Sequence, residues 1–217
     1  MTLPVLDQNS QLFLQGYLTT ILLSVAALAL ALVIGIVGAS ARVWGGGVVQ
    51  AFARGYVEFF RNTPLLVQLL FYAVLLAPAN LNITREPILA AIIGLGVYTG
   101  AYVTEVVRSG ILSVDTLQIE AARTLGLSQL EALRFVVLPQ AVRTVIPPLG
   151  NLSIALVKNT AIASGIAATE LLKVAGIIES RTGEFTPYLA VLVAYWTLTL
   201  PLAWVVSRLE RRLAFAR

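Results

Sequence analysis

The chain contains no cysteine and no histidine among its 217 residues. Without cysteine there are no disulfides and no thiol chemistry, and without histidine the commonest general base is missing. Together these absences exclude zinc sites of the usual type. Charged residues are also scarce, at 12% of the chain against roughly 25% in soluble domains. Since its apolar segments hold few carboxylates as well, the chain is a poor candidate for a membrane enzyme.

Long hydrophobic runs are abundant instead. Hydrophobic residues make up 58% of the chain, against roughly 45–50% in soluble domains. A membrane span needs about 20 mostly apolar residues, and five segments meet this requirement. We therefore predict an all-α, polytopic membrane helix bundle formed by a single domain over residues 1–217. The predicted spans are Leu12–Ala41, Tyr56–Ala77, Pro87–Leu112, Val145–Ala168 and Pro187–Val206.

The arginines favour one orientation in the membrane. Cytosolic loops carry an excess of Lys and Arg, and an outside N-terminus leaves only Arg85, Lys173 and Arg181 on the outer side. We therefore expect the N-terminus outside and the C-terminus in the cytosol. No Lys or Arg precedes Arg42, so a signal peptide is not expected. We attribute the basic pI to these anchoring arginines and not to nucleic-acid binding, because no basic run with interleaved aromatics occurs.

The longest predicted cytosolic segment is polar and favours helix. Glu120–Arg123 is a good helix former, and Gly126 permits the left-handed turn that ends a helix. Ser128 with Glu131 forms a capping box that starts a second helix, which Pro139 is expected to end. Such a helical hairpin suits docking into a groove on a partner. A solvated connector with ordinary caps would show the same local signals.

The spacing of this segment resembles the EAA loop of bacterial ABC importer permeases. The residues that carry the resemblance are Glu120, Ala121, Ala122, Gly126, Val136, Leu138 and Pro139. Val136 stands where the family usually has Ile, and Leu117-Gln118 where it usually has Gly-Gln. Residues 12–210 also resemble the polar amino acid permeases of the histidine, glutamine, glutamate and arginine type. That wider resemblance rests on Gly16–Ser24, Glu58–Gln68, Ala101–Ile111, Leu138–Ala141, Ile146–Leu149 and Lys158–Thr160.

The resemblance implies a type I importer permease in the bacterial cytoplasmic (inner) membrane, with a coupling loop at about 113–143. It also implies three kinds of protein partner: two copies of a cytosolic ATPase, a second permease subunit (identical or a sister), and an extracytoplasmic solute-binding protein that delivers a polar amino acid. The chain has no G-x-x-x-x-G-K-[ST] P-loop, since Lys158 and Lys173, its only lysines, do not follow glycine. ATP and Mg²⁺ are therefore expected on the ATPase, with no cofactor and no metal in this chain.

Polar residues within the predicted spans are candidates for the substrate path, because ionisable groups are costly in a bilayer. The candidates are Asn62, Thr63, Gln68, Glu105, Arg108, Lys158, Asn159 and Thr160. Lys158 is expected to face the bundle interior and to find a carboxylate, with Glu105 and Glu58 available. Glu105 and Arg108, three residues apart, share one helix face, as do Glu58 and Arg61.

Other interpretations of these residues stay open. The sequence Asn62-Thr63-Pro64 predicts a helix break, with Thr63 as N-cap and Pro64 in the first helical position, and broken helices often hold transporter substrates. The charged pairs could instead lock a gate or the fold, with Lys158 lying between subunits. Gly96-x-x-x-Gly100 matches the small-residue packing motif.

A different class of transporter is the main alternative. An ion-gradient-driven carrier or channel for small polar solutes would use Lys158 and Glu105 as an ion path. That alternative leaves the cytosolic hairpin without a role, and we therefore favour the ATP-driven importer permease.

Overall fold

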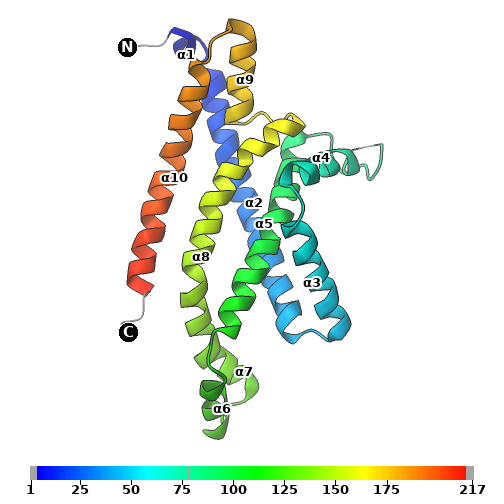
Figure 1. The fold of residues 1–217 in the computed structure, drawn as a ribbon, viewed down its shortest axis with the longest axis vertical. Helices are drawn as coiled ribbons and strands as arrows, with labels where there is room; N and C mark the ends of the chain where they lie inside the picture. Colours follow the sequence, from blue (N-terminus) through cyan, green and yellow to red (C-terminus); the bar gives the residue numbers. More distant parts are fainter. Residues whose placement is uncertain (1–3, 78, 214–217) are drawn as a thin grey trace.

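The computed structural model describes residues 4–77 and 79–213, and within these ranges every regular element is helical. The elements are α1 (Pro4–Gln8), α2 (Ser10–Trp44), α3 (Gly47–Arg61), α4 (Leu65–Leu75), α5 (Pro87–Leu112), α6 (Thr116–Thr124), α7 (Gln129–Ala132), the π-helix η1 (Leu133–Val137), α8 (Leu138–Asn159), the 3₁₀-helix η2 (Thr160–Ile166), α9 (Leu171–Thr182) and α10 (Thr186–Leu213). The long helices α2, α5, α8 and α10 form an elongated bundle, and α6 and α7 project from one end of it (Figure 1).

Small residues hold α2 and α5 together at the centre of this bundle. A Cβ atom at Gly35 would lie 2.2 Å from Val103 Cγ1, and one at Gly100 would lie 2.9 Å from Ile34 Cγ2. Gly96 also approaches α2 too closely for a side chain. Lipid supplies no hydrophobic force between helices, so close backbone approach is how spans associate. The opposite face of α2 carries large exposed aliphatic side chains, as a lipid-facing surface requires.

The helix bounds agree with some of the predicted spans and correct others. Pro87–Leu112 is one continuous helix, as predicted. Within the described residues, three helices (α2, α5 and α10) are long and apolar enough to cross a membrane. A fourth span is added if Gln129–Ile166 and Leu171–Thr182, bent by 47°, cross as one unit. The predicted span Tyr56–Ala77 is divided between α3 and α4, so the predicted count of five is not confirmed.

The break between α3 and α4 falls where it was predicted, but its caps differ. Thr63 is not the N-cap of α4: Pro64 holds that position, and Thr63 Oγ1 donates to the Phe59 carbonyl at 2.8 Å. Gln68 Nε2 closes the break by donating to Phe60 O at 3.0 Å, to Thr63 O at 3.1 Å and to Thr63 Oγ1 at 2.6 Å. The two carbonyl acceptors fix the amide orientation, and Gln68 Oε1 is then buried without a partner in the described part of the chain.

A second break separates α8 from α9. After η2, Ala167 takes a positive φ of 64° before α9 begins. The fully buried Glu170 caps α9, accepting from Leu172 N at 2.9 Å, Lys173 N at 2.8 Å and Tyr195 Oη at 2.9 Å. In broken transporter helices such an N-terminus often binds an anionic substrate group. Here the carboxylate of Glu170 occupies that position.

Tyr195→Phe is expected to destabilise the bundle, because it removes one donor from this buried carboxylate. Leaving a buried polar group underbonded costs about 1–3 kcal/mol. Thermal unfolding of the detergent-solubilised protein should therefore begin at a lower temperature. Tyr17→Phe is the matched control, since it removes a tyrosine hydrogen bond to Thr197 at an exposed site. Equal shifts for the two variants would contradict a stabilising role for the Glu170 contact.

Candidate functional site

The cytosolic hairpin has the local geometry that its sequence predicts. Gly126 ends α6 with a φ of 91°, a conformation that costs glycine little. The capping box of Ser128 and Glu131 is confirmed, with the Ser128 N–H donating to Glu131 Oε2 at 2.8 Å. These two features turn the chain sharply between α6 and α7, so the hairpin projects as a compact unit from the end of the bundle (Figure 1).

Pro139 does not end the second helix of the hairpin, contrary to the prediction. The helix α7 continues through the π-helix η1 into α8, and Pro139 lies in the first turn of α8. In a regular α-helix a proline lacks the donor N–H and clashes with the carbonyl four residues before it. Here Pro139 directly follows the π-turn, in which the Leu138 N–H donates to the Leu133 carbonyl five residues back. The hairpin is therefore continuous with a long helix of the bundle, and a push on α7 acts directly on α8.

A glutamine pair that sequence reasoning missed closes the base of the hairpin. Gln140 Nε2 donates to Gln118 Oε1 at 2.7 Å and to the Val136 carbonyl at 3.0 Å. This contact joins the α6 arm to the first turn of α8. The two glutamines lie 22 positions apart, so no local periodicity indicates that they meet.

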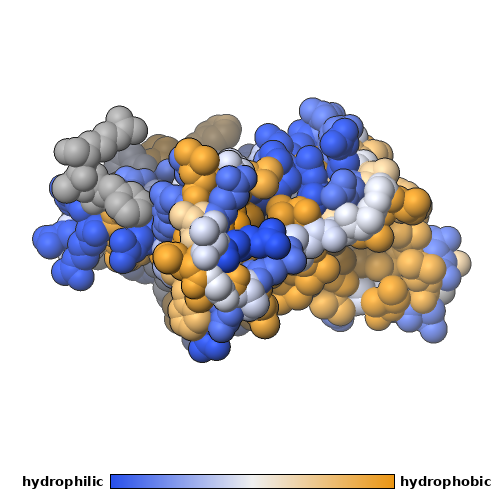
Figure 2. All heavy atoms as spheres, turned by 90° about the horizontal axis from the view of Figure 1, so that it is seen from below, coloured by the Kyte–Doolittle hydropathy of each residue, from blue (hydrophilic) through white to orange (hydrophobic). Residues whose placement is uncertain are grey.

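The outer face of the hairpin is unusually apolar for a segment outside the bundle. Ala122 and Ala132 are buried in its inner face. Glu120, Ala121 and Leu138 are exposed. The large apolar side chains that are also exposed are Leu117 at 67%, Leu125 at 86%, Leu130 at 73% and Phe135 at 62%. Seen from the hairpin end, hydrophobic patches lie among hydrophilic ones (Figure 2). Such a mixed apolar surface is typical of a protein interface.

Ser128→Ala is expected to loosen the start of α7. The hydrogen bonds from the Ser128 hydroxyl and backbone N–H hold the pKa of Glu131 below its ordinary value of 4.5. This stabilisation is therefore present at neutral pH and lost as the pH falls through that lowered pKa. Losing a Ser cap costs about 1 kcal/mol, so amide hydrogen exchange over residues 128–132 should accelerate several-fold at pH 7. Ser180→Ala, which removes another exposed Ser hydrogen bond, should leave this segment unchanged. Unchanged exchange in Ser128→Ala would show that the box does not stabilise α7.

An ion cluster joins α2 to α5 towards the hairpin end of the bundle. Glu105 accepts from Arg42 Nη1 at 2.7 Å and also pairs with Arg108, whose Nε lies 3.2 Å from both carboxylate oxygens. The pairing with Arg108 follows the predicted spacing. Arg42 was not predicted as a partner, because it lies 63 positions away.

A small cavity of about 140 Å³ lies between α5 and α8. Its polar lining includes Tyr98, Tyr102 and Asn159. The two tyrosine hydroxyls lie 3.1 Å apart, and the Arg61 guanidinium lies 5.2 Å from the centre of the Tyr102 ring. Of the predicted substrate-path residues, the structure thus places Asn159 here. The tyrosines were missed because sequence position alone does not show which aromatics face a cavity.

The remaining predicted site residues lie elsewhere. Lys158 does not face the interior and pairs with no carboxylate within the described residues. Its side chain is exposed, and Glu105 pairs instead with Arg42 and Arg108. No ion pair joins Glu58 to Arg61 in the same residues, and Glu58 is exposed. Thr160 is fully buried and donates to the Val157 carbonyl.

Three further predicted substrate-path residues lie at the break between α3 and α4. Asn62 is exposed and donates to the Glu58 carbonyl at 2.7 Å. Thr63 and Gln68 bond to each other within the break, as described above. Each therefore shapes the break and lies apart from the cavity between α5 and α8.

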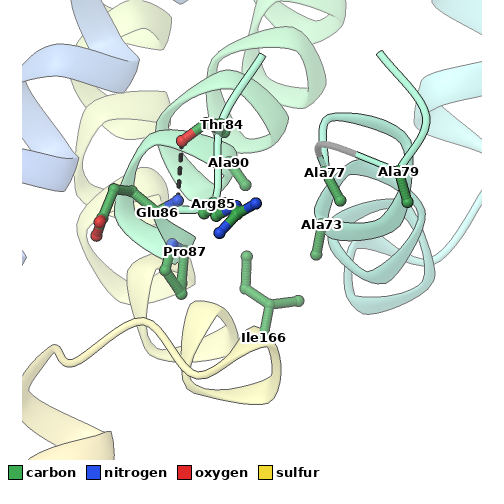
Figure 3. Close-up of a pocket in the computed structure, with 9 residues that line it drawn as sticks. All are labelled: Ala73, Ala77, Ala79, Thr84, Arg85, Glu86, Pro87, Ala90 and Ile166. Carbon is green, nitrogen blue, oxygen red and sulfur yellow. Dashed lines mark hydrogen bonds between the residues drawn. The ribbon is translucent and has the colours of Figure 1, made fainter. Parts of the chain in front are cut away.

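A larger cavity of about 490 Å³ lies between α4, the start of α5 and η2. Its walls are mostly small side chains, and the Arg85 guanidinium points into it (Figure 3). The neighbouring Glu86 carboxylate points away from the cavity (Figure 3). In residues 4–77 and 79–213 no group of three or more acidic, His or Cys side chains could hold a metal ion.

Comparison with known proteins identifies the family. Residues 31–215 match the family described as "Binding-protein-dependent transport system inner membrane component". The chain belongs to this family. It is the membrane-spanning permease subunit of an ABC importer, and ATP hydrolysis belongs to a separate subunit. The fold is that of a type I importer permease.

Bacterial relatives align over nearly the whole chain. The protein named "Probable glutamine ABC transporter permease protein GlnM" of Bacillus subtilis is 38% identical, over 98% of each chain. The "Glutamine transport system permease protein GlnP" of Escherichia coli is 36% identical, over 93% of each chain. A solved structure described as "an amino acid ABC transporter with histidines" is 34% identical with a TM-score of 0.86, over 98% of this permease and all of that chain. A chain of a solved structure described as "Inward facing conformations of the MetNI methionine ABC transporter" shares the fold, with a TM-score of 0.78 at 22% identity, over 99% of this permease and all of that chain.

Proposed function

We propose that this permease carries a polar amino acid, with L-glutamine as the first candidate. The relatives named above support the substrate class, since two are named for glutamine. The chemistry of the cavity between α5 and α8 also supports it. Tyrosine hydroxyls and the Asn159 amide can hydrogen-bond to ammonium and carboxylate groups alike.

We infer that a second permease subunit completes the path. Lys158 is exposed, although it lies within a predicted span and directly precedes the cavity residue Asn159. A lysine at such a depth is costly unless it faces water or a counter-charge. A partner permease on this face of α8 would enclose a shared aqueous path, where Lys158 could meet the substrate carboxylate. The partner could be an identical copy or a sister subunit.

We propose further that the apolar outer face of the hairpin docks on the ATPase. Two ATPase copies would each contact one permease, bind ATP and Mg²⁺, and move α8 through the continuous α7–η1–α8 rod. The hairpin then lies in the cytosol, with the C-terminus on the same side and the N-terminus outside. An extracytoplasmic solute-binding protein would deliver the substrate. The chain acts as one permease domain in this arrangement.

Measuring amino acid uptake into proteoliposomes tests the proposed substrate directly. Proteoliposomes holding the permease, its ATPase and its binding protein should accumulate radiolabelled L-glutamine when ATP is enclosed. Unlabelled glutamine, glutamate, histidine and arginine should compete to different extents, and leucine should not compete. Accumulation of no amino acid, or the strongest competition by leucine, would contradict the proposed substrate class.

A further inference from the structure

Two charged residues, Arg85 and Glu86, line the cavity beside α4, and the local backbone sets the directions of their side chains. The Glu86 N–H donates to Thr84 Oγ1 at 2.9 Å, which holds the loop before α5 in a fixed turn. Successive side chains then leave on opposite sides. The Arg85 guanidinium points into the cavity and the Glu86 carboxylate points away (Figure 3).

No residue described by the structure supplies a counter-charge to this guanidinium. Among the described residues that line the cavity, only Glu86 is acidic, and no ion pair joins Glu86 to Arg85. The rest of the wall is mostly short or apolar, formed by Ala73, Ala77, Ala79, Ala90, Pro87 and Ile166. At about 490 Å³ the cavity falls in the usual size range for small-molecule sites, about 300–1,000 Å³.

Guanidinium has a specific chemical preference. It presents parallel N–H donors that match the two oxygens of a carboxylate, which makes such pairs stronger and more directional than a lysine contact. The alanines leave open space beside the guanidinium, so a ligand with a carboxylate and a short polar or aliphatic body would fit. Free amino acids have this form.

We propose that this cavity is an entry site, in which Arg85 binds the α-carboxylate of the amino acid cargo. The inference rests on the proposed function and on the orientation that places this end of the bundle outside. Ile166, which lines the cavity, belongs to η2, and η2 directly follows Lys158 and Asn159 in the chain. An amino acid leaving the entry site would therefore meet the polar residues at the end of α8 next.

The absence of cysteine allows a test confined to this cavity. Ala79→Cys places a single thiol on its exposed wall. The rate of alkylation by a membrane-impermeant maleimide is measured on the permease–ATPase complex in proteoliposomes. L-Glutamine should slow alkylation, halving the rate at about its dissociation constant. The analogue 4-aminobutanamide, which is glutamine without the α-carboxylate, should give no protection.

Substitutions then assign the protection to the guanidinium. Arg85→Gln in the Ala79→Cys background should abolish protection, and Arg85→Lys should retain it only at higher L-glutamine concentration. Arg181→Gln removes a positive charge from α9, which does not line the cavity. In this variant L-glutamine should slow alkylation as much as in the parent. A thiol at Ser180→Cys should react equally with and without L-glutamine.

Three results would overturn the entry site. These are equal alkylation with and without L-glutamine, full protection in Arg85→Gln, and protection by ligand-free binding protein but not by free L-glutamine. The last result would make the cavity a docking surface for that protein. Uptake of L-glutamine by the Ala79→Cys variant is measured in parallel. Uptake without protection overturns the entry site alone, whereas failure of every amino acid to be taken up contradicts the proposed function.

Discussion

Gly126→Pro should reduce ATP-driven uptake to background while the protein still inserts and folds. Gly126 has a φ of 91°, and proline holds φ near −65°. The substitution also removes the hydrogen bond from the Gly126 N–H to the Arg123 carbonyl. Strain of this kind costs about 1–3 kcal/mol, and the lost hydrogen bond about 1 kcal/mol more. The turn between α6 and α7 should therefore open and displace the apolar docking face. ATP hydrolysis by the ATPase is then expected to become independent of substrate.

Gly183→Pro is the matched control for this prediction. Gly183 also has a positive φ, 71°, and its N–H donates to a carbonyl of the preceding helix, that of Glu179. It lies at the opposite end of the bundle from the hairpin, after α9 (Figure 1). Both variants should lose similar stability, but only Gly126→Pro should uncouple hydrolysis from uptake. Normal coupling in Gly126→Pro, at normal membrane levels, would contradict the docking role of the hairpin.

Glu105→Gln should give the second large effect, on both stability and uptake. Glu105 is the only carboxylate between Arg42 of α2 and Arg108 of its own helix among the described ion pairs. Its removal leaves two arginines facing each other without a counter-charge. Breaking a fully buried pair in this way costs about 3–5 kcal/mol, and partly exposed pairs cost less. With side chains 15–27% exposed, we expect a loss of about 2 kcal/mol and uptake reduced at least about tenfold.

Glu58→Gln provides the comparison, because Glu58 is exposed and forms no ion pair within the described residues. It removes the same charge from a helix of the same bundle. Thermal unfolding and uptake should both stay near those of the unmodified permease. If the two variants behaved alike, the Arg42–Glu105–Arg108 cluster would not be what holds α2 to α5 at this end.

Features with local causes could be predicted from the sequence. The capping box at Ser128 and the turn at Gly126 depend on residues three or four positions apart, as does the break before Pro64. The Pro139 error has a local cause too. Proline both ends helices and begins them, and only the presence of η1 shows that the helix continues through it.

Contacts between distant segments could not be predicted in this way. The carboxylate partner of Lys158 was sought in Glu105 or Glu58, but Glu105 pairs with Arg42 and Arg108 instead. Gln118 and Gln140 meet only because the hairpin folds back on α8. Lys158 itself is exposed on this single subunit, and a sequence does not show which helix face a second subunit covers. Tyr98 and Tyr102 line a cavity that forms only where α5 packs against α8, so the sequence alone does not mark them as site residues.

The source of energy is the central claim, and one uptake measurement tests it most directly. Proteoliposomes containing the permease, with and without its ATPase, are loaded with ATP or given a proton or sodium gradient, and labelled L-glutamine is supplied with the binding protein. We predict accumulation only when ATPase and ATP are both present, with no response to either gradient. Accumulation driven by a gradient in the absence of ATPase would contradict the account and identify the chain as a gradient-driven carrier.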